Sequence, residues 1–245
     1  MSSTTVDPVF RPGGAPPPPE HRPAPGRMGW LRSFYRTTIG KKVVMAVTGI
    51  VLVGYLVVHV SGNLLMFRSP DAINAYAEFL KSSAVLLWTV RVLVFGSLIL
   101  HVLAAYSLTR LNAAARPDGY KRVEHRAATW SARSLRIGGV ILLGFFVFHI
   151  LHFTTGQVHP QFDVHDVYRN VIIGFGSTVV AGFYLVAMVA LGFHLHHGFW
   201  SLFQTLGLNH PHLNPVRRVL ATLLAVALPV GFSVVVLAVM LGYLS

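Results

Sequence analysis

Four histidines lie deep inside four separate apolar segments of the chain: His59, His101, His149 and His194. An ionisable ring in hydrocarbon is costly and rare, so each intramembrane histidine is a candidate functional residue. Imidazole is an axial ligand of haem iron, and iron held by two imidazoles has no open coordination position, which favours electron transfer over oxygen binding. Two such irons would form a path for electrons through a membrane.

The segments that carry these histidines are long enough to cross a bilayer. The chain has 245 residues, of which 53% are hydrophobic and 11% charged, a balance typical of membrane proteins. Spans of about 20 apolar residues are predicted near 43–67, 86–108, 137–155, 171–198 and 219–244. We therefore predict an all-α membrane protein whose five transmembrane helices form a bundle that encloses two haems b.

The proline-rich N-terminus and the lack of cysteine set further limits on the fold and on the cofactors. Residues 1–27 carry most of the prolines and no apolar run, which predicts a disordered cytoplasmic tail. The five-helix transmembrane domain is then expected to comprise residues 28–245. The chain has no cysteine, so it cannot ligate an iron–sulfur cluster by thiolate or attach haem covalently. Any such cluster must belong to a partner.

Basic residues are divided unevenly between the loops on the two sides of the membrane. One side holds Arg32, Arg36, Lys41, Lys42, Arg110, Arg116, Lys121, Arg122, Arg126, Arg133, Arg136, Arg217 and Arg218. The other side holds Arg68, Lys81, Arg91 and Arg169. The positive-inside rule therefore predicts a cytoplasmic N-terminus and an external C-terminus. The net charge of +12 reflects this topology, and nucleic acid is not an expected partner.

Depth in the membrane sorts the four histidines into two pairs, because a helix rises about 1.5 Å per residue. His59 and His149 lie far along helices that run outward, so both belong to the outer half. His101 and His194 lie near the cytoplasmic ends of their helices, so both belong to the inner half. The alternative for each ring is an interhelical hydrogen bond that only aids packing. Matched depths favour ligation of two haems.

Small residues recur three or four positions from these histidines, on the same helix faces: Gly62, Ser97, Ala104, Ala105, Ala190 and Gly198. They would make room for a flat macrocycle. Small-residue faces are also common wherever membrane helices approach closely, so this feature alone favours packing.

Four further residues have two interpretations each. His152 lies one turn beyond His149 and is either the true ligand or, as we prefer, a residue behind it that contacts the ligand, a propionate or a quinone. His196 and His197 are expected at the inner interface, where they either contact a haem propionate or, as we prefer, are exposed to headgroups. Glu78, in the amphipathic stretch 71–81, is either a solvated carboxylate or a proton-handling group beside an outer quinone.

Five segments together resemble a known family: GKKVVMAVTG at 40–49, HVSGNL at 59–64, NAYAEFL at 74–80, FHILHFTTG at 148–156 and FHLHHGFWSLFQTLGLNHP at 193–211. The chain resembles the single-chain, five-helix, dihaem cytochrome b subunits that anchor menaquinone-linked succinate dehydrogenases and fumarate reductases. The likeness extends from about residue 40 to the C-terminus. The last segment is the most specific.

The resemblance implies a role and a ligand set. His59 and His149 would hold the haem distal to the soluble subunits, and His101 and His194 the proximal one. It implies a bacterial cytoplasmic membrane, partners that are an FAD-containing flavoprotein and an iron–sulfur subunit, and menaquinone as the substrate of this subunit. Dicarboxylate chemistry would occur on the partner, in either direction. Glu78 falls where some members place a carboxylate near a distal quinone.

Two other functions compete with this one. The cytochrome b subunit of another quinone-linked enzyme, such as a formate dehydrogenase or hydrogenase, also uses membrane histidines, but those proteins usually have four spans. A haem-free membrane anchor or transporter would use the histidines for packing or proton relay. Transporters of this size often show repeats or broken helices around a midplane site, and the sequence shows neither.

Overall fold

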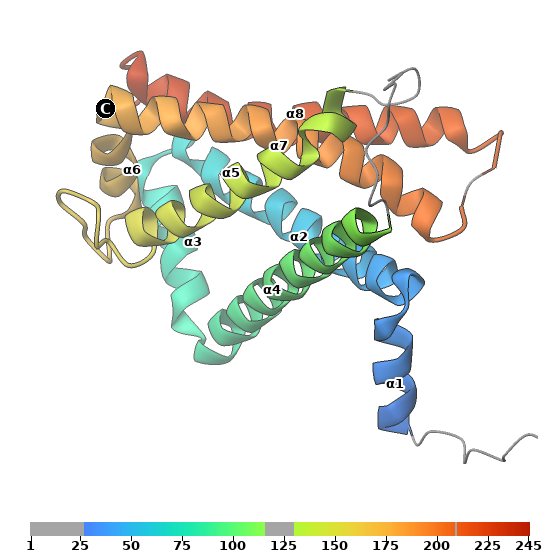
Figure 1. Cartoon of the computed structure of the whole chain (residues 1–245). Coiled ribbons are helices and arrows are strands. Elements are labelled where there is room, and N and C mark those ends of the chain that lie inside the picture. Colours follow the sequence, from blue (N-terminus) through green and yellow to red (C-terminus); the bar gives the residue numbers. More distant parts are fainter. Residues whose placement is uncertain (1–26, 116–129, 209) are drawn as a thin grey trace, which may run out of the picture.

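The computed structural model describes residues 27–115, 130–208 and 210–245, and nearly all of them are helical (Figure 1). The helices in chain order are α1 Arg27–Arg36, α2 Thr38–Asn63, the 3-10 turn η1 Leu64–Phe67, α3 Pro70–Ser82, α4 Ala84–Ala114, α5 Trp130–Phe153, α6 Val167–Gly176, α7 Thr178–Thr205 and α8 Asn214–Met240. Of the tail predicted at 1–27, only residue 27 is among the described residues. The basic residues predicted in the loop at 116–129 also lie outside them.

Within the described residues, five helices are long and apolar enough to cross a membrane: α2 with η1, α4, α5 from Leu135 onward, α7 and α8. The predicted all-α membrane fold with five spans is therefore confirmed. The short helices α3 and α6 gather with the C-terminus at one end of the bundle, and α1 projects from the other end (Figure 1). We refer to these as the α3–α6 end and the α1 end.

Local sequence signals start the helices. The Thr37 and Ser83 hydroxyls accept hydrogen bonds from the N–H groups of Gly40 and Leu86, and so cap α2 and α4. Ser69 caps α3 in the same way, and Pro70 fills the first helical position.

The fourth span begins later than its apolar run. We expected a helix from residue 171, but α6 ends at Gly176 and α7 starts at Thr178. Ser177 between them has φ −81° and ψ 113°, an extended conformation that no helix contains. Two nearby glycines, Gly174 and Gly176, weaken the helix there. As a result α6 is free to fold over the α3–α6 end.

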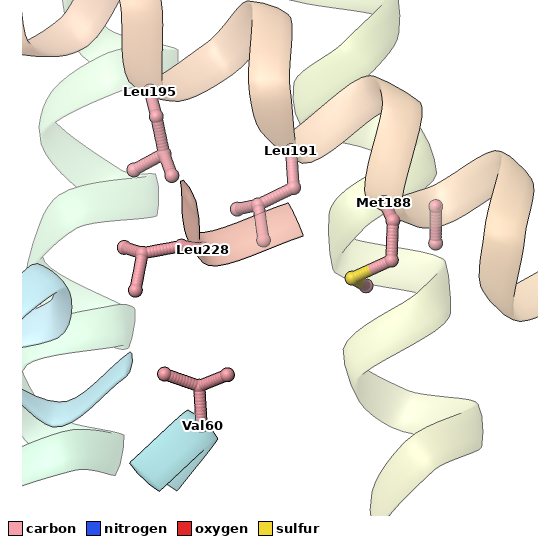
Figure 2. Packing of buried hydrophobic residues seen from close by; sticks show 6 residues of the cluster. Val60, Met188, Leu191, Leu195 and Leu228 are labelled. Atoms are coloured by element: carbon pink, nitrogen blue, oxygen red, sulfur yellow. The ribbon is translucent and has the colours of Figure 1, made fainter. Parts of the chain in front are cut away.

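The spans pack as two pairs with a fifth helix alongside. Helix α2 packs against α4, and α5 against α7, whereas α8 lies along α7 and also contacts α2. A buried apolar cluster joins three of these helices and contains Val60 from α2, Met188, Leu191 and Leu195 from α7, and Leu228 from α8 (Figure 2). The cluster fixes α2 relative to α7 and so sets the spacing between the two pairs.

Helices α7 and α8 come very close near Pro229, which lies inside α8. Proline has no N–H to bond the carbonyl of Ala225. A Cβ placed on Gly192 of α7 would lie 3.0 Å from that carbonyl oxygen. Glycine at position 192 therefore permits this close approach of the two backbones.

Candidate functional site

Two histidine pairs lie between the helix pairs. The rings of His59 on α2 and His149 on α5 have their centroids 5.8 Å apart, with an angle of 78° between their planes. The rings of His101 on α4 and His194 on α7 are 6.3 Å apart and inclined at 55°. Each pair thus takes one ring from α2 or α4 and the other from α5 or α7. These are the pairs that depth along the helices predicts.

The spacing of the rings suits two ligands of one metal ion. A transition metal binds an imidazole nitrogen at about 2 Å, so two imidazoles on opposite sides of one iron have ring centroids about 6 Å apart. Both observed separations, 5.8 and 6.3 Å, are close to this value. A porphyrin supplies four equatorial nitrogens, so two axial rings complete a six-coordinate iron.

The two pairs occupy different levels of the bundle. His101 is level with Thr48 of α2, whose hydroxyl it contacts at 3.1 Å, and Thr48 precedes His59 by eleven residues. On α5, Gly138 lies beside the His194 cavity and precedes His149 by eleven residues as well. Eleven residues of helix span about 16 Å. Two planar groups stacked at these levels would be separate but close enough for electron exchange.

The second ring nitrogen of His101 is held by Thr48. The Thr48 hydroxyl donates its proton to the carbonyl oxygen of Val44, at 2.7 Å. It therefore accepts at its oxygen from the Nδ1–H of His101, 3.1 Å away. This bond places the proton on Nδ1 and leaves the Nε2 lone pair available for a metal, the arrangement that metal-ligating histidines generally show.

A tyrosine holds the second ring nitrogen of His149. The Tyr184 hydroxyl lies 3.3 Å from His149 Nδ1 and 3.1 Å from His152 Nδ1. His152 is 1% exposed and Tyr184 is 5% exposed, so these two hydrogen-bonded side chains are buried inside the protein. The structure thus places the two neighbouring histidines differently: the ring of His149 faces His59, and His152 lies behind it.

His194 supplies an independent test of whether a metal-bound group fits. Its Nδ1 is buried and, among the described residues, has no hydrogen-bond partner, a situation that is costly in an apolar environment. Beside the ring is a cavity of about 340 Å³ lined otherwise by apolar residues: Leu135, Ile137, Gly138, Ile141, Val186, Val189, Ala190 and Phe193. An imidazole at the wall of an apolar cavity suits an iron porphyrin, so the residues present fit the group.

The small residues near the histidines do not all serve the same purpose. Gly138 and Ala190 line the cavity beside His194, as a macrocycle would require. A Cβ on Gly62, however, would lie 2.6 Å from Cε1 of Tyr76 in α3, so this glycine makes room for that ring. Ala104 is fully buried in α4, which packs on α2. For Gly62 and Ala104 the packing interpretation holds.

The remaining candidates are placed as follows. The Glu78 carboxylate is 53% exposed, 3.7 Å from Lys81 Nζ and 3.4 Å from His165 Nδ1. His196 and His197 are half-buried near the end of α7. His159, in the loop before α6, is 7% exposed, and its Nε2 lies 2.9 Å from the carbonyl oxygen of Asn170.

The α3–α6 end is tied together by side-chain hydrogen bonds. The Asn74 amide in α3 donates to Asp166 Oδ1 at 3.0 Å, and the Tyr168 N–H donates to Asn74 Oδ1 at 3.0 Å. Asp166 also caps α6 by accepting from the Arg169 N–H. That backbone bond, followed by the bond from Asn74, lowers the pKa of the Asp166 carboxyl. These contacts cover the end of the bundle nearer His59 and His149.

Sequence reasoning missed two of the residues described above, Thr48 and Tyr184. Their only sequence signal is a hydroxyl group within an apolar span, and such groups usually bond to their own helix. Thr48 does so as well, at Val44. In the part of the chain that the structure describes, no three side chains of His, Cys, Asp or Glu are grouped to hold a metal ion.

Comparison with known proteins supports the resemblance seen in the sequence. The chain is 26% identical over 183 residues to the succinate dehydrogenase cytochrome b558 subunit of Bacillus subtilis (strain 168). The match covers 74% of this chain and 84% of that protein. No family model matches the chain, and no solved structure matches it. The match and the five apolar helices support a membrane-anchor cytochrome b role and a multi-pass bacterial membrane protein.

Proposed function

We propose that the chain is the cytochrome b subunit that anchors a succinate dehydrogenase to the membrane and passes electrons from an iron–sulfur subunit through two bis-histidine haems to menaquinone, or in the reverse direction during fumarate reduction. The observation that carries this proposal is the pair of histidine couples at two levels between the helix pairs, with ring centroids 5.8 and 6.3 Å apart. Similarity to the Bacillus subtilis subunit supports it independently.

The residues have distinct tasks in this proposal. His59 and His149 hold the outer haem, and His101 and His194 hold the inner one. When bound, the haems supply one-electron steps between the iron–sulfur subunit and quinone. Thr48 keeps the His101 ring oriented, and the apolar lining around His194 excludes water. Low polarity and fixed ligand orientation are two of the properties through which a protein sets a haem potential.

The orientation of the chain completes the electron path. With the N-terminus on the cytoplasmic side, the α1 end and the inner haem face the flavoprotein, which carries the FAD, and the iron–sulfur subunit, which carries the clusters. This chain has no cysteine and so cannot ligate such clusters by thiolate. The α3–α6 end and the outer haem then face the opposite surface. We place the menaquinone site at that end, with Glu78 as a candidate for proton transfer.

Four single substitutions test the ligand assignment. His101→Ala and His194→Ala should each remove the inner haem, and His59→Ala and His149→Ala should each remove the outer one, so that every variant keeps one haem per chain. Pyridine haemochrome assays and redox titration of the purified complex give the number and identity of the haems. Loss of the same haem in the His101 and His149 variants would contradict the pairing.

A further inference from the structure

Behind the outer histidine pair lies a buried chain of three side chains, in which the Tyr184 hydroxyl is 3.3 Å from His149 Nδ1 and 3.1 Å from His152 Nδ1. If His149 ligates iron through Nε2, its neutral ring must carry its proton on Nδ1. Nδ1–H then donates to the oxygen of Tyr184, and the Tyr184 O–H donates to His152 Nδ1. Both proton positions follow from this one assumption, which rests on the proposed function.

We infer that Tyr184, supported by His152, is a positioning residue that orients the axial ligand of the outer haem and lowers the potential of that haem. An oxygen that accepts from the ligand's N–H raises the basicity of the ligand, and a more basic ligand stabilises the ferric state. Tyr184 is a better acceptor because it also donates to His152, since bonds in such a chain strengthen one another.

Packing holds this chain in one geometry. The Tyr184 ring meets Phe145 and Phe175 edge to face, with centroids 5.0 and 4.9 Å away. The His152 ring stacks on Phe148 at 5.3 Å. Because aromatic contacts surround both rings, neither ring can move away from the other without displacing its neighbours.

The inner haem has a shorter counterpart, which provides a matched control. There the Nδ1–H of His101 donates to Thr48, which donates to the backbone carbonyl of Val44. The two chains share no residue and lie at different levels of the bundle. A substitution in one chain should therefore shift the potential of one haem and leave the other unchanged.

The test is a redox titration of both haems in the purified complex, followed by their reduced visible bands and their low-spin electron paramagnetic resonance signals. Tyr184→Phe should retain both haems and raise the potential of the outer one alone. Thr48→Val should raise the inner one alone. Tyr55→Phe, in the ring that stacks on His59 at 5.4 Å, should shift the outer potential less than Tyr184→Phe.

Substitution of His152 keeps the inference falsifiable if Tyr184→Phe loses haem for structural reasons. His152→Leu removes the acceptor behind Tyr184 and should raise the outer potential, whereas His152→Gln keeps an acceptor oxygen and should restore it. Unchanged potentials in Tyr184→Phe or in His152→Leu, with two haems still bound, would overturn the inference and leave the proposed function standing. A wild-type complex without haem would overturn the proposed function itself.

Discussion

Substitution of Gly174 by alanine should destabilise the α3–α6 end and disturb the outer haem. A Cβ at position 174 would lie 2.9 Å from Cε1 of His152 and 2.9 Å from Cζ of Phe153. Ordinary contacts of this kind are about 3.5–4 Å, so one of the rings or α6 must move by several tenths of an ångström. His152 is 1% exposed and has no space to yield into. Overpacking of a filled interior costs about 1–3 kcal/mol.

The expected loss can be measured as a shift in thermal unfolding. A loss of about 2 kcal/mol lowers the unfolding temperature by roughly 4–8 °C for a chain of this length. Circular dichroism of the purified protein in detergent measures this temperature. Gly176→Ala is the control, because it lies in the same helix and its Cβ would meet nothing within 4 Å. This variant should be as stable as wild type, or slightly more so, since alanine favours helix over glycine.

The Gly174 variant also has an expected effect on the haem. Displacement of His152 lengthens its bond to Tyr184, so the potential of the outer haem should rise and that of the inner haem should not. If Gly174→Ala unfolds at the same temperature as the Gly176→Ala control, and the potentials of both haems are unchanged, the tight packing of α6 on His152 is refuted.

Three further substitutions have defined outcomes. Lys41→Met removes the hydrogen bonds of the Lys41 ammonium to the carbonyl oxygens of Tyr35 and Arg36, at 3.1 and 2.9 Å. Their loss should cost about 2 kcal/mol, which corresponds to roughly 30-fold faster hydrogen exchange in α1. Unchanged exchange would refute the role of Lys41 in anchoring α1. Asp166→Ala removes the cap of α6 and should cost about 1 kcal/mol in thermal unfolding. Because the pKa of Asp166 is lowered on folding, that contribution should be the same at pH 7 and pH 6 and disappear only as the pH falls below about 4. A contribution that is already lost at pH 6 would contradict this. Glu78→Gln should slow menaquinone turnover with both haems retained, and wild-type turnover would exclude a proton-handling role.

Much of the architecture could be predicted from the sequence because each span is an uninterrupted apolar run of bilayer length. The pairing of the four histidines could also be predicted, since charge asymmetry gives direction and helix rise gives depth. Both features depend only on position along one helix. The observed neighbours, His59 with His149 and His101 with His194, follow from these two quantities.

Features that depend on contacts between distant segments could not be predicted. Tyr184 is 35 residues from His149, and Thr48 is 53 residues from His101, so only the packed bundle brings them together. The break at Ser177 falls within a continuous apolar run, where hydropathy gives no signal. The burial of His159 could not be predicted either, because the residue lies in a polar loop and only the fold brings the carbonyl oxygen of Asn170 in α6 to its ring.

The haem content of the purified complex tests the central claim most directly. Pyridine haemochrome analysis should give two haems b per chain, and the reduced spectrum should show the sharp bands of six-coordinate, low-spin iron without the features of an open coordination position. One haem per chain, none, or a high-spin species that binds carbon monoxide would contradict two bis-histidine haems between the helix pairs.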